Sequence, residues 1–354
     1  MTDRRQFLGC TAAAAAAVAL PACGGGHADP APGIPRSPFG PETTGEEATV
    51  GMDLSGRLAV VTGCTSGIGL ETMRVLALRG AYVVGTGRTL EKAQAACRGI
   101  RGVTTPVALE LGEPESVLAC AEAIRSLDTP IDILVCNAGM RAWDYRAVNG
   151  IEAQFAVNHL GHFLLVNRLL DRLFVAWQGR IVVVSSRTAY RDVPPGGIDF
   201  GGLDDPAAFA GGHAYGQSKL ANALFSLELA RRLKGTRITS NALHPGVIDT
   251  EIDRGVAAPL QAAFGLYTAL FGKNVQQGAA TSCHVATSPE LGAVSGEFFE
   301  DCNPVRIRGD NYLRDTSLAE RLWEFSVEQL RPWLVEHRRP DWDEIGRRLR
   351  PARG

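Results

Sequence analysis

Short apolar runs and longer amphipathic stretches alternate along the chain from Gly56 onward. Runs that are rich in Val and Ile, lack polar alternation and end in turn-forming residues predict strands buried on both faces. These runs are Leu58–Thr62, Tyr82–Gly85, Thr105–Leu109, Ile131–Cys136, Arg180–Ser185 and Ile238–Leu243. Buried strands of this kind are typical of a parallel sheet that is covered by helices.

The stretches between these runs have the apolar spacing of helices. They include Leu70–Arg79, Glu115–Leu127, Ile151–Leu173 and Tyr215–Leu233. Strand–helix alternation predicts a single α/β domain, a doubly wound parallel sheet, over residues 54–335. Within it, residues 251–335 are expected to form a helical extension with a late strand near Gly296–Phe299, and residues 336–354 a basic, irregular tail.

Composition and charge are those of a globular protein without a polyanionic partner. The 354 residues are 45% hydrophobic and 21% charged, and a net charge of −2 gives no electrostatic basis for binding nucleic acid. The eight cysteines are scattered, without a C-x-x-C pair or zinc spacing. We therefore expect no metal site, and we interpret the core cysteines as small buried hydrophobes. Nothing in the pattern defines an oligomeric state.

The N-terminal segment differs from the rest of the chain. A twin-arginine pattern at Arg4-Arg5 precedes an alanine-rich apolar run, and Leu20-Pro21-Ala22-Cys23 resembles a bacterial lipoprotein cleavage box. Residues 1–23 therefore predict an export signal, with Cys23 as a candidate lipid attachment and membrane tether. Residues 24–53, rich in Pro and Gly, predict a flexible linker. The alternative is a leader that is not used, which would leave the protein in the cytoplasm.

A glycine-rich turn joins the first predicted strand to the first predicted helix. Its sequence is Thr62-Gly63-Cys64-Thr65-Ser66-Gly67-Ile68-Gly69. Gly63 permits the tight turn, Gly67 lets the backbone approach a pyrophosphate, and Gly69 lets helix and strand pack closely. The free N–H groups at the helix start would bind the phosphates. Because it follows a strand and opens a helix, the turn predicts a dinucleotide-binding loop, with Thr65, Ser66 and Ile68 among its contacts.

The end of the second predicted strand indicates which dinucleotide is bound. An acidic residue there would bond the ribose 2′-hydroxyl of NAD and repel a 2′-phosphate. This chain has Gly87 and then Arg88, whose planar guanidinium suits a phosphate. The sequence therefore favours NADP(H) over NAD(H); the alternative is that Arg88 is a solvated residue at a helix start.

Tyr215 and Lys219 lie four residues apart, which places a phenol and an ammonium on one helix face. A free tyrosine has a pKa near ~10, and a neighbouring cation favours its phenolate. Such a pair can give a proton to a carbonyl oxygen or take one from an alcohol at neutral pH. Other candidates follow predicted strands or lie in the next helix: Asn137, Ala138, Gly139, Asn158, Ser186, Pro245, Gly246, Val247 and Thr250.

Taken in order, these motifs resemble the short-chain dehydrogenase/reductase family over residues 54–335. The segments most similar to its retinol-dehydrogenase-like branch, which is related to light-dependent protochlorophyllide reductase, are Asn158–Phe163, Tyr215–Asn222, Ala242–Val247 and Leu318–Trp323. The resemblance implies a Rossmann fold and hydride transfer from the B face of the nicotinamide. It also implies that Asn158, Ser186, Tyr215 and Lys219 form a catalytic tetrad.

The resemblance further implies how the remaining residues contact the cofactor. Asn137 and Gly139 would line the adenosine ribose, Lys219 would also bond the nicotinamide ribose, and the backbone near Val247, with Thr250, would hold the carboxamide. The chain departs from the family where Glu110, followed by Leu111, replaces the usual aspartate against the adenine. Ser185 precedes Ser186 directly, so the choice of Ser186 follows the family register.

The sequence thus predicts an NADP-dependent oxidoreductase that interconverts a carbonyl and an alcohol on a small apolar substrate. Residues 187–214 and 251–273 would form the rim of its pocket. The alternative is a catalytically silent dinucleotide-binding sensor or scaffold on the same fold. His159 and His162 have the spacing of metal ligands on a helix, but packing is the interpretation we favour, because no third ligand is apparent.

Overall fold

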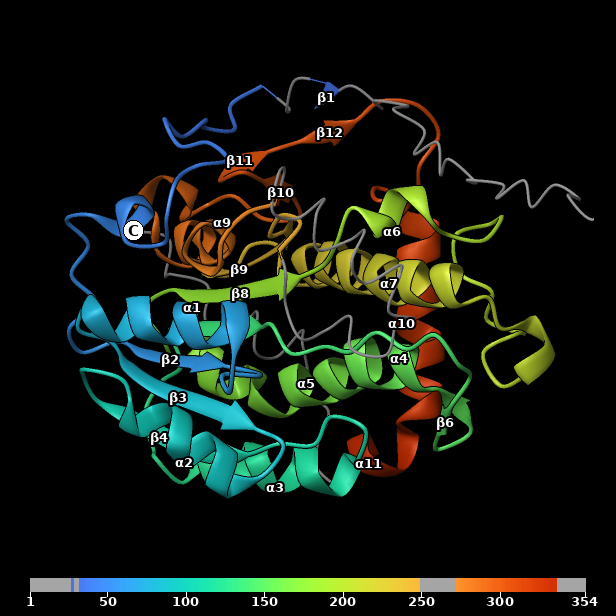
Figure 1. The fold of residues 1–354 in the computed structure, drawn as a ribbon, viewed down its shortest axis with the longest axis horizontal. Helices are drawn as coiled ribbons and strands as arrows, with labels where there is room; N and C mark the ends of the chain where they lie inside the picture. Colours follow the sequence, from blue (N-terminus) through green and yellow to red (C-terminus); the bar gives the residue numbers. More distant parts are fainter. Residues whose placement is uncertain (1–26, 29–31, 249–271, 336–354) are drawn as a thin grey trace, which may run out of the picture.

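The computed structural model describes residues 27–28, 32–248 and 272–335. A twisted sheet runs through the middle of this part of the chain (Figure 1). Eight strands follow the order β11-β10-β9-β8-β5-β2-β3-β4. Their bounds are β2 Leu58–Val61, β3 Tyr82–Gly87, β4 Thr104–Ala108, β5 Ile133–Cys136, β8 Gly179–Val184, β9 Ile238–His244, β10 Phe298–Glu300 and β11 Asn303–Pro304. All neighbours pair in parallel except β10 and β11. The predicted doubly wound sheet is confirmed.

The strand order places the ligand-binding edge between β2 and β5. The chain builds outward from β2 through β3 to β4, and then returns to β5 on the other side of β2. In open parallel sheets, ligands bind outside the carboxyl ends of the strands where the order reverses in this way. The turn at Gly63 and the turn at Asn137 leave β2 and β5 at that edge.

Helices cover both faces of the sheet and enclose two apolar cores. One core packs residues of α3 (Pro114–Arg125), α5 (Gly161–Phe174), α7 (Gly211–Arg232) and α10 (Thr316–Gln329) against the sheet. The other core packs residues of α1 (Gly67–Leu78), α2 (Leu90–Arg98) and α9 (Val275–Thr287). Figure 1 shows α10 in red beside α7, and α1 close to α9.

The predicted helix over residues 151–173 is interrupted. It begins with the short strand β7 (Ile151–Glu152) and the turn α4 (Ala153–Phe155), and then passes through a π-helical turn, Ala156–Leu160, before α5. The late strand predicted near Gly296–Phe299 is present as β10. The helical extension is confirmed for α9, α10 and α11 (Arg331–Val335), whereas residues 251–271 and the tail from 336 lie outside the described residues.

Part of the predicted flexible linker is packed on the domain. Residues 37–53, called the strap below, lie against α1 and α9 and contain a 3-10 turn, Glu47–Thr49. Ala48 and Thr49 are buried, and the ring of Phe39 meets the imidazole of His284 edge-on at 5.4 Å. The prediction of a flexible linker is therefore wrong for residues 37–53.

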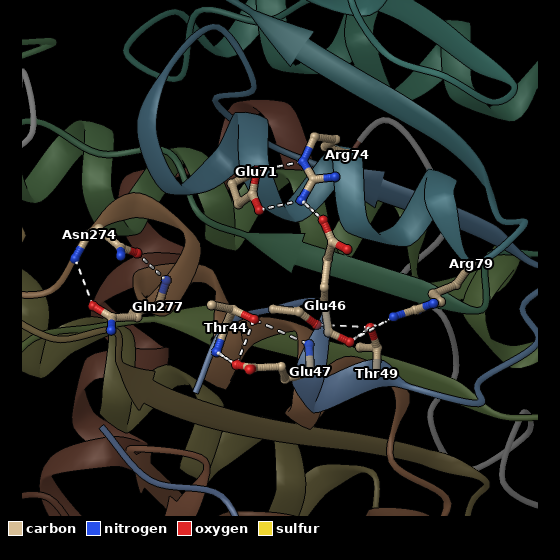
Figure 2. A network of polar contacts seen from close by, with 10 residues as sticks. Thr44, Glu46, Glu47, Thr49, Glu71, Arg74, Arg79, Asn274 and Gln277 are labelled. Carbon is tan, nitrogen blue, oxygen red and sulfur yellow. Dashed lines mark hydrogen bonds and ion pairs between the residues drawn. The ribbon is translucent and has the colours of Figure 1, made fainter. Parts of the chain in front are cut away.

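Arg74 of α1 and Arg79, which directly follows α1, hold the strap in place (Figure 2). Arg74 donates to Glu46 at 2.6 Å and to Glu71 in its own helix. Arg79 donates to the hydroxyl of Thr49 at 3.0 Å and to the carbonyl of Glu46 at 2.7 Å. These bonds satisfy backbone and side-chain groups that a free linker would leave to water, which is why this stretch is ordered. Among the described helices, we find none with the length and apolarity that crossing a membrane requires.

Candidate active site

The glycine turn between β2 and α1 forms a cradle in which side chains at Gly63 and Gly69 would clash with neighbouring backbone. Gly63 and Gly67 have φ values of +71° and +56°, which glycine adopts without strain. A Cβ on Gly63 would lie 2.9 Å from the backbone of Ala138, and one on Gly69 would overlap the carbonyl of Gly63. Glycine at these two positions therefore lets the turn pack directly against the turn after β5 and against its own carbonyl. The free N–H groups at the start of α1, which this turn leads into, are where a pyrophosphate would bind.

The turns after β2 and β5 are joined through Thr62. Its hydroxyl oxygen accepts from the backbone N–H groups of Asn137 and Ala138, each at 2.9 Å. The side-chain amide of Asn137 donates to the Thr62 carbonyl at 2.8 Å. Asn137 and Ala138 therefore lie at the carboxyl edge of the sheet, where their hydrogen bonds to Thr62 hold the turn after β5 against the glycine turn.

The two cysteines of this edge are not reactive groups. Cys64 and Cys136 are fully buried, and burial raises the pKa of the Cys136 thiol to about 12 and that of Cys64 further. The thiolate is the reactive form of cysteine, so both residues act as small apolar groups.

The adenosine end of the candidate cofactor site contains Arg88 and Glu110. Arg88 is exposed between β3 and α2, and a Cβ on the preceding Gly87 would lie 2.6 Å from the Thr65 methyl, so this turn adjoins the glycine turn. The Glu110 carboxylate accepts from the backbone N–H of Gly112 at 3.2 Å. Leu111 is buried against the start of α5, since a Cβ on Gly161 would overlap its carbonyl.

Tyr215 and Lys219 lie on one face of α7, as the four-residue spacing predicts. The Lys219 ammonium lies 5.8 Å from the centre of the Tyr215 ring and donates to the carbonyl of Val184 at 3.2 Å. Burial lowers the pKa of Lys219 to about 8. A Cβ on Gly139 would lie 3.2 Å from the ammonium and 3.1 Å from the Asn158 carbonyl oxygen of the side chain, so these residues meet at the end of β5.

Asn158 connects the turn after β5 to α7. Its side-chain amide oxygen accepts from the N–H of Met140 at 2.7 Å, and its amide nitrogen donates to the Met140 carbonyl at 2.9 Å and to the Ser218 hydroxyl at 3.0 Å. Ser218 in turn donates to the carbonyl of Tyr215 at 2.8 Å. Asn158 is therefore held rigidly between the β5 turn and the helix that carries Tyr215.

The two adjacent serines at the end of β8 have different surroundings. Ser185 is buried and donates to the carbonyl of Lys219 at 2.6 Å. The Ser186 oxygen is partly exposed and accepts from the N–H of Thr188 at 3.2 Å. The Ser185 hydroxyl is therefore bonded to α7, whereas the Ser186 hydroxyl is the partly exposed one of the two.

The turn after β9 forms the other side of the site. Gly246 has a φ of +112°, and a Cβ there would lie 2.6 Å from the side chain of Lys273. The carbonyl of Val247 accepts from the N–H of Lys273 at 2.8 Å, and Pro245 is buried. Thr250 lies outside the described residues, as does most of the predicted rim over residues 251–273.

Arg141 lies at this site although no sequence motif indicates it. Its guanidinium lies 4.3 Å from the ring centre of Trp143 and 5.1 Å from that of Tyr215, a cation–π geometry. The available signal was a cation two residues after the Asn137–Gly139 motif, but only the fold brings that turn against α7. Among the described residues, no group of His, Cys, Asp and Glu is arranged to hold a metal ion.

Comparisons with known proteins identify the family of this chain. Residues 57–197 match the family model described as short chain dehydrogenase, and residues 1–21 match that of the TAT (twin-arginine translocation) pathway signal sequence. Short-chain dehydrogenase TIC 32 B, chloroplastic, of Brassica napus is 39% identical over 310 residues, 83% of this chain and 94% of that protein. Retinol dehydrogenase 12 of Homo sapiens is 39% identical over 285 residues, 79% of this chain and 88% of that protein.

Solved structures share the fold. An uncharacterized protein from Mycobacterium paratuberculosis has a TM-score of 0.64 and 30% identity, covering 80% of this chain and 97% of that one. A short chain dehydrogenase/reductase family protein has a TM-score of 0.55 and 25% identity, covering 70% and 96%. The chain belongs to the short-chain dehydrogenase/reductase family, whose members are oxidoreductases that bind a nicotinamide dinucleotide. Within that family its relatives include retinol dehydrogenases and TIC 32 proteins.

Proposed function

We propose that this protein is an NADP-dependent oxidoreductase that interconverts an aldehyde or ketone and its alcohol on an apolar substrate, with Tyr215 as general acid and base. The observation that carries the proposal is the meeting of Lys219, Gly139 and Asn158 beside the Tyr215 ring, at the sheet edge where ligands bind. The names of the retinol dehydrogenase relatives support an alcohol or carbonyl substrate of apolar character.

The residues present suit NADP(H). The cradle at Gly63, Gly67 and Gly69 would hold the pyrophosphate at the start of α1, and Arg88 would bond the 2′-phosphate. Glu110, with Leu111, would line the adenine, and Asn137 and Gly139 the adenosine ribose. We expect the dinucleotide to make further contacts with Thr65, Ser66, Ile68, Ala138, Lys219, Pro245, Gly246, Val247 and Thr250. The bound dinucleotide supplies or accepts the hydride.

The protein residues move the proton and stabilise charge. In the reducing direction, the carbonyl carbon gains the hydride while its oxygen takes the proton from the Tyr215 hydroxyl, leaving a phenolate. Lys219 stabilises that phenolate, and Ser186 donates a hydrogen bond to the same substrate oxygen. In the oxidising direction the phenolate takes the alcohol proton. Asn158 holds the Met140 backbone and Ser218, and thereby fixes α7 against the β5 turn.

The N-terminal leader, residues 1–23, bears on where in the cell this activity takes place. The match of residues 1–21 to twin-arginine signals supports export of the protein in folded form, with its dinucleotide bound beforehand. Lipid attachment at Cys23 would anchor it in the envelope. The presence of the uncleaved chain in the cytosol of the source cell would contradict this part of the proposal.

The first test is turnover by a chain that begins at Gly33, which removes the leader and retains the strap. We expect NADPH oxidation with hydrophobic aldehydes or ketones, and a fall in kcat of about 10²- to 10⁴-fold in Tyr215→Phe, the range that a general acid contributes. Tyr82→Phe is the matched control, because the Tyr82 hydroxyl bonds Thr105 between β3 and β4, remote from the site.

The outcomes separate the alternatives. NADPH binding without turnover by the parent protein would favour a silent sensor. Equal turnover by the parent and Tyr215→Phe would exclude Tyr215 as the proton donor. A loss in Tyr82→Phe as large as that in Tyr215→Phe would assign the effect to stability instead.

A further inference from the structure

The π-helical turn Ala156–Leu160 carries Asn158, and two buried imidazoles follow Asn158 in sequence. His159 lies within the turn, and His162 lies one turn further on, in α5. Turns of this kind are rare, interrupt the regular hydrogen bonding of a helix, and occur often at functional sites. What holds this turn therefore bears on the position of Asn158.

The hydrogen bonds of Thr62 determine the tautomer of His162. The Thr62 oxygen accepts from two backbone N–H groups, those of Asn137 and Ala138, so its own O–H must donate. The His162 Nε2 atom lies 2.9 Å from that oxygen, whereas the carbonyl of Val135 lies 3.4 Å away. Nε2 is therefore an acceptor, and the neutral ring carries its hydrogen on Nδ1.

The hydrogen on Nδ1 of His162 connects this ring to Asn158, the residue that links the turn after β5 to α7. The Nδ1 atom lies 2.9 Å from the main-chain carbonyl of Asn158 and donates to it. The ring remains neutral because burial, with the nearby charge of Lys219, lowers the pKa of His162 to about 4. A chain of hydrogen bonds thus runs from the turns after β2 and β5, through Thr62 and His162, to Asn158.

His159 makes the opposite kind of contact. Its Nε2 lies 2.7 Å from the hydroxyl of Ser326 in α10, and that hydroxyl donates to the Leu322 carbonyl at 2.7 Å. The hydroxyl therefore accepts from His159, whose hydrogen is on Nε2. His159 joins the π-helical turn to α10, away from the dinucleotide edge, and so provides a matched comparison for His162.

The geometry points to His162 as a positioning residue: as the Nδ1–H tautomer it fixes the main-chain carbonyl of Asn158 relative to the dinucleotide-binding edge. This inference rests on the proposed function, because it assigns His162 a role in the turnover that Tyr215 and Lys219 perform. Misplacement of such a group is expected to affect kcat more than the binding of either substrate.

Three variants of the chain that begins at Gly33 test the inference. In His162→Leu, both bonds are lost, and we expect kcat to fall by up to about 100-fold with little change in the dissociation constant for NADPH. In His162→Asn, part of this loss is recovered, because an asparagine can donate to the carbonyl four residues earlier. Asn167 does so in the same helix, to Phe163 at 2.7 Å. His159→Leu removes an equally buried ring, and we expect a similar loss of Tm with a much smaller loss of kcat.

The inference is overturned if His159→Leu and His162→Leu lose kcat equally, or if His162→Asn recovers nothing. The ¹⁵N chemical shifts of the imidazoles in the parent protein test it independently of turnover. We expect His162 to show a protonated Nδ1 and a bare Nε2 down to about pH 5, identified by the signals missing in His162→Asn. A hydrogen on Nε2 of His162 instead would overturn the hydrogen-bond chain from Thr62 through His162 to Asn158. A parent protein without turnover would refute the proposed function, while these spectra would still decide the tautomer.

Discussion

Arg88 is the single residue on which the choice of dinucleotide depends. It is exposed at the turn between β3 and α2, beside Gly87 and the exposed Thr65 of the glycine turn. A guanidinium in this position can make charge-assisted hydrogen bonds to a 2′-phosphate, worth about 1.5–3 kcal/mol each. An acidic side chain there would repel that phosphate and bond a ribose hydroxyl instead.

We therefore expect Arg88→Glu to lower kcat/KM for NADPH by roughly 10- to 100-fold and to raise it for NADH. Steady-state kinetics with both cofactors measure the change, and Arg98→Glu at the far end of α2 is the control for a general effect of charge. A parent protein that already prefers NADH would contradict the assignment.

The candidate site residues that the sequence alone can predict are those whose placement follows from local spacing. The interval between Tyr215 and Lys219 defines a helix face, and the positions of Gly63 and Asn137 after apolar runs define a sheet edge. Arg141 could not be found in this way, because its stacking on Tyr215 depends on how the β5 turn meets α7. The same holds for the bond between Thr62 and His162, which are 100 residues apart in sequence.

At the scale of elements, the strap is the part of the described structure that differs most from the sequence-based prediction, which was a flexible linker. A stretch rich in Pro and Gly reads as a linker whether it is free or packed, because composition reports only the lack of helical or strand periodicity. The partners of the strap lie in α1 and α9 and near Asn303, far away in sequence. The apolar strands, by contrast, are predicted correctly, because a run of Val and Ile without polar alternation itself indicates burial on both faces.

We expect the strap to contribute to the stability of the domain. Removal of residues 1–50 deletes Glu46 and Thr49 and exposes the apolar face that Ala48 covers, whereas removal of residues 1–32 leaves the strap intact. The chain without residues 1–50 should lose roughly 2–4 kcal/mol of unfolding free energy, about 1 kcal/mol for each of the three hydrogen bonds that Arg74 and Arg79 donate to the strap, because these groups are partly exposed to water. Urea unfolding of the two chains measures the difference.

A point substitution distinguishes the contacts of the strap from its mere presence. Glu46→Ala, which removes the acceptor for Arg74, should lose part of that free energy (Figure 2). Glu42→Ala, which removes an exposed contact to Gln277, should lose almost none. Equal stability of both truncated chains would mean that the strap is held by the domain without stabilising it.

At the scale of the whole molecule, four buried imidazoles make the fold sensitive to acid. Burial lowers the pKa of His159 to about 3 and those of His162 and His284 to about 4, and it lowers that of His244 well below the usual value of 6.5. Below pH 6.5 the unfolded chain therefore binds protons that the folded chain does not. Above pH 6.5 the neutral imidazoles do not reduce the free energy of unfolding. As the pH decreases from 6.5 toward 4, that free energy falls by about 1.4 kcal/mol per pH unit for each imidazole.

We accordingly expect the free energy of unfolding to fall steeply as the pH decreases below 6.5, as measured by urea unfolding at a series of pH values and monitored by circular dichroism. His159→Gln, whose amide can still donate to Ser326, should reduce the slope of stability against pH by one proton between pH 6 and about 4.5. An unchanged slope would show that His159 does not titrate on unfolding.

The thiols of the molecule are compatible with an oxidising compartment. The six cysteines in the described part of the chain are all buried and free. Burial raises the pKa of each of these thiols, for example that of Cys302 to about 11. Because oxidation proceeds through an accessible thiolate, these residues can remain reduced outside the cytoplasm.

The short ribbon at the N-terminus has a geometric consequence for attachment to a bilayer. Strand β1 (His27–Ala28) pairs with β12 (Arg306–Ile307), and His27 is only four positions after Cys23 in the sequence. Since an extended residue spans about 3.5 Å, a lipid on Cys23 would keep the β12 edge within roughly 14 Å of the headgroups. The domain would then be oriented as well as attached, with one side always facing the membrane and little freedom to rotate about its anchor.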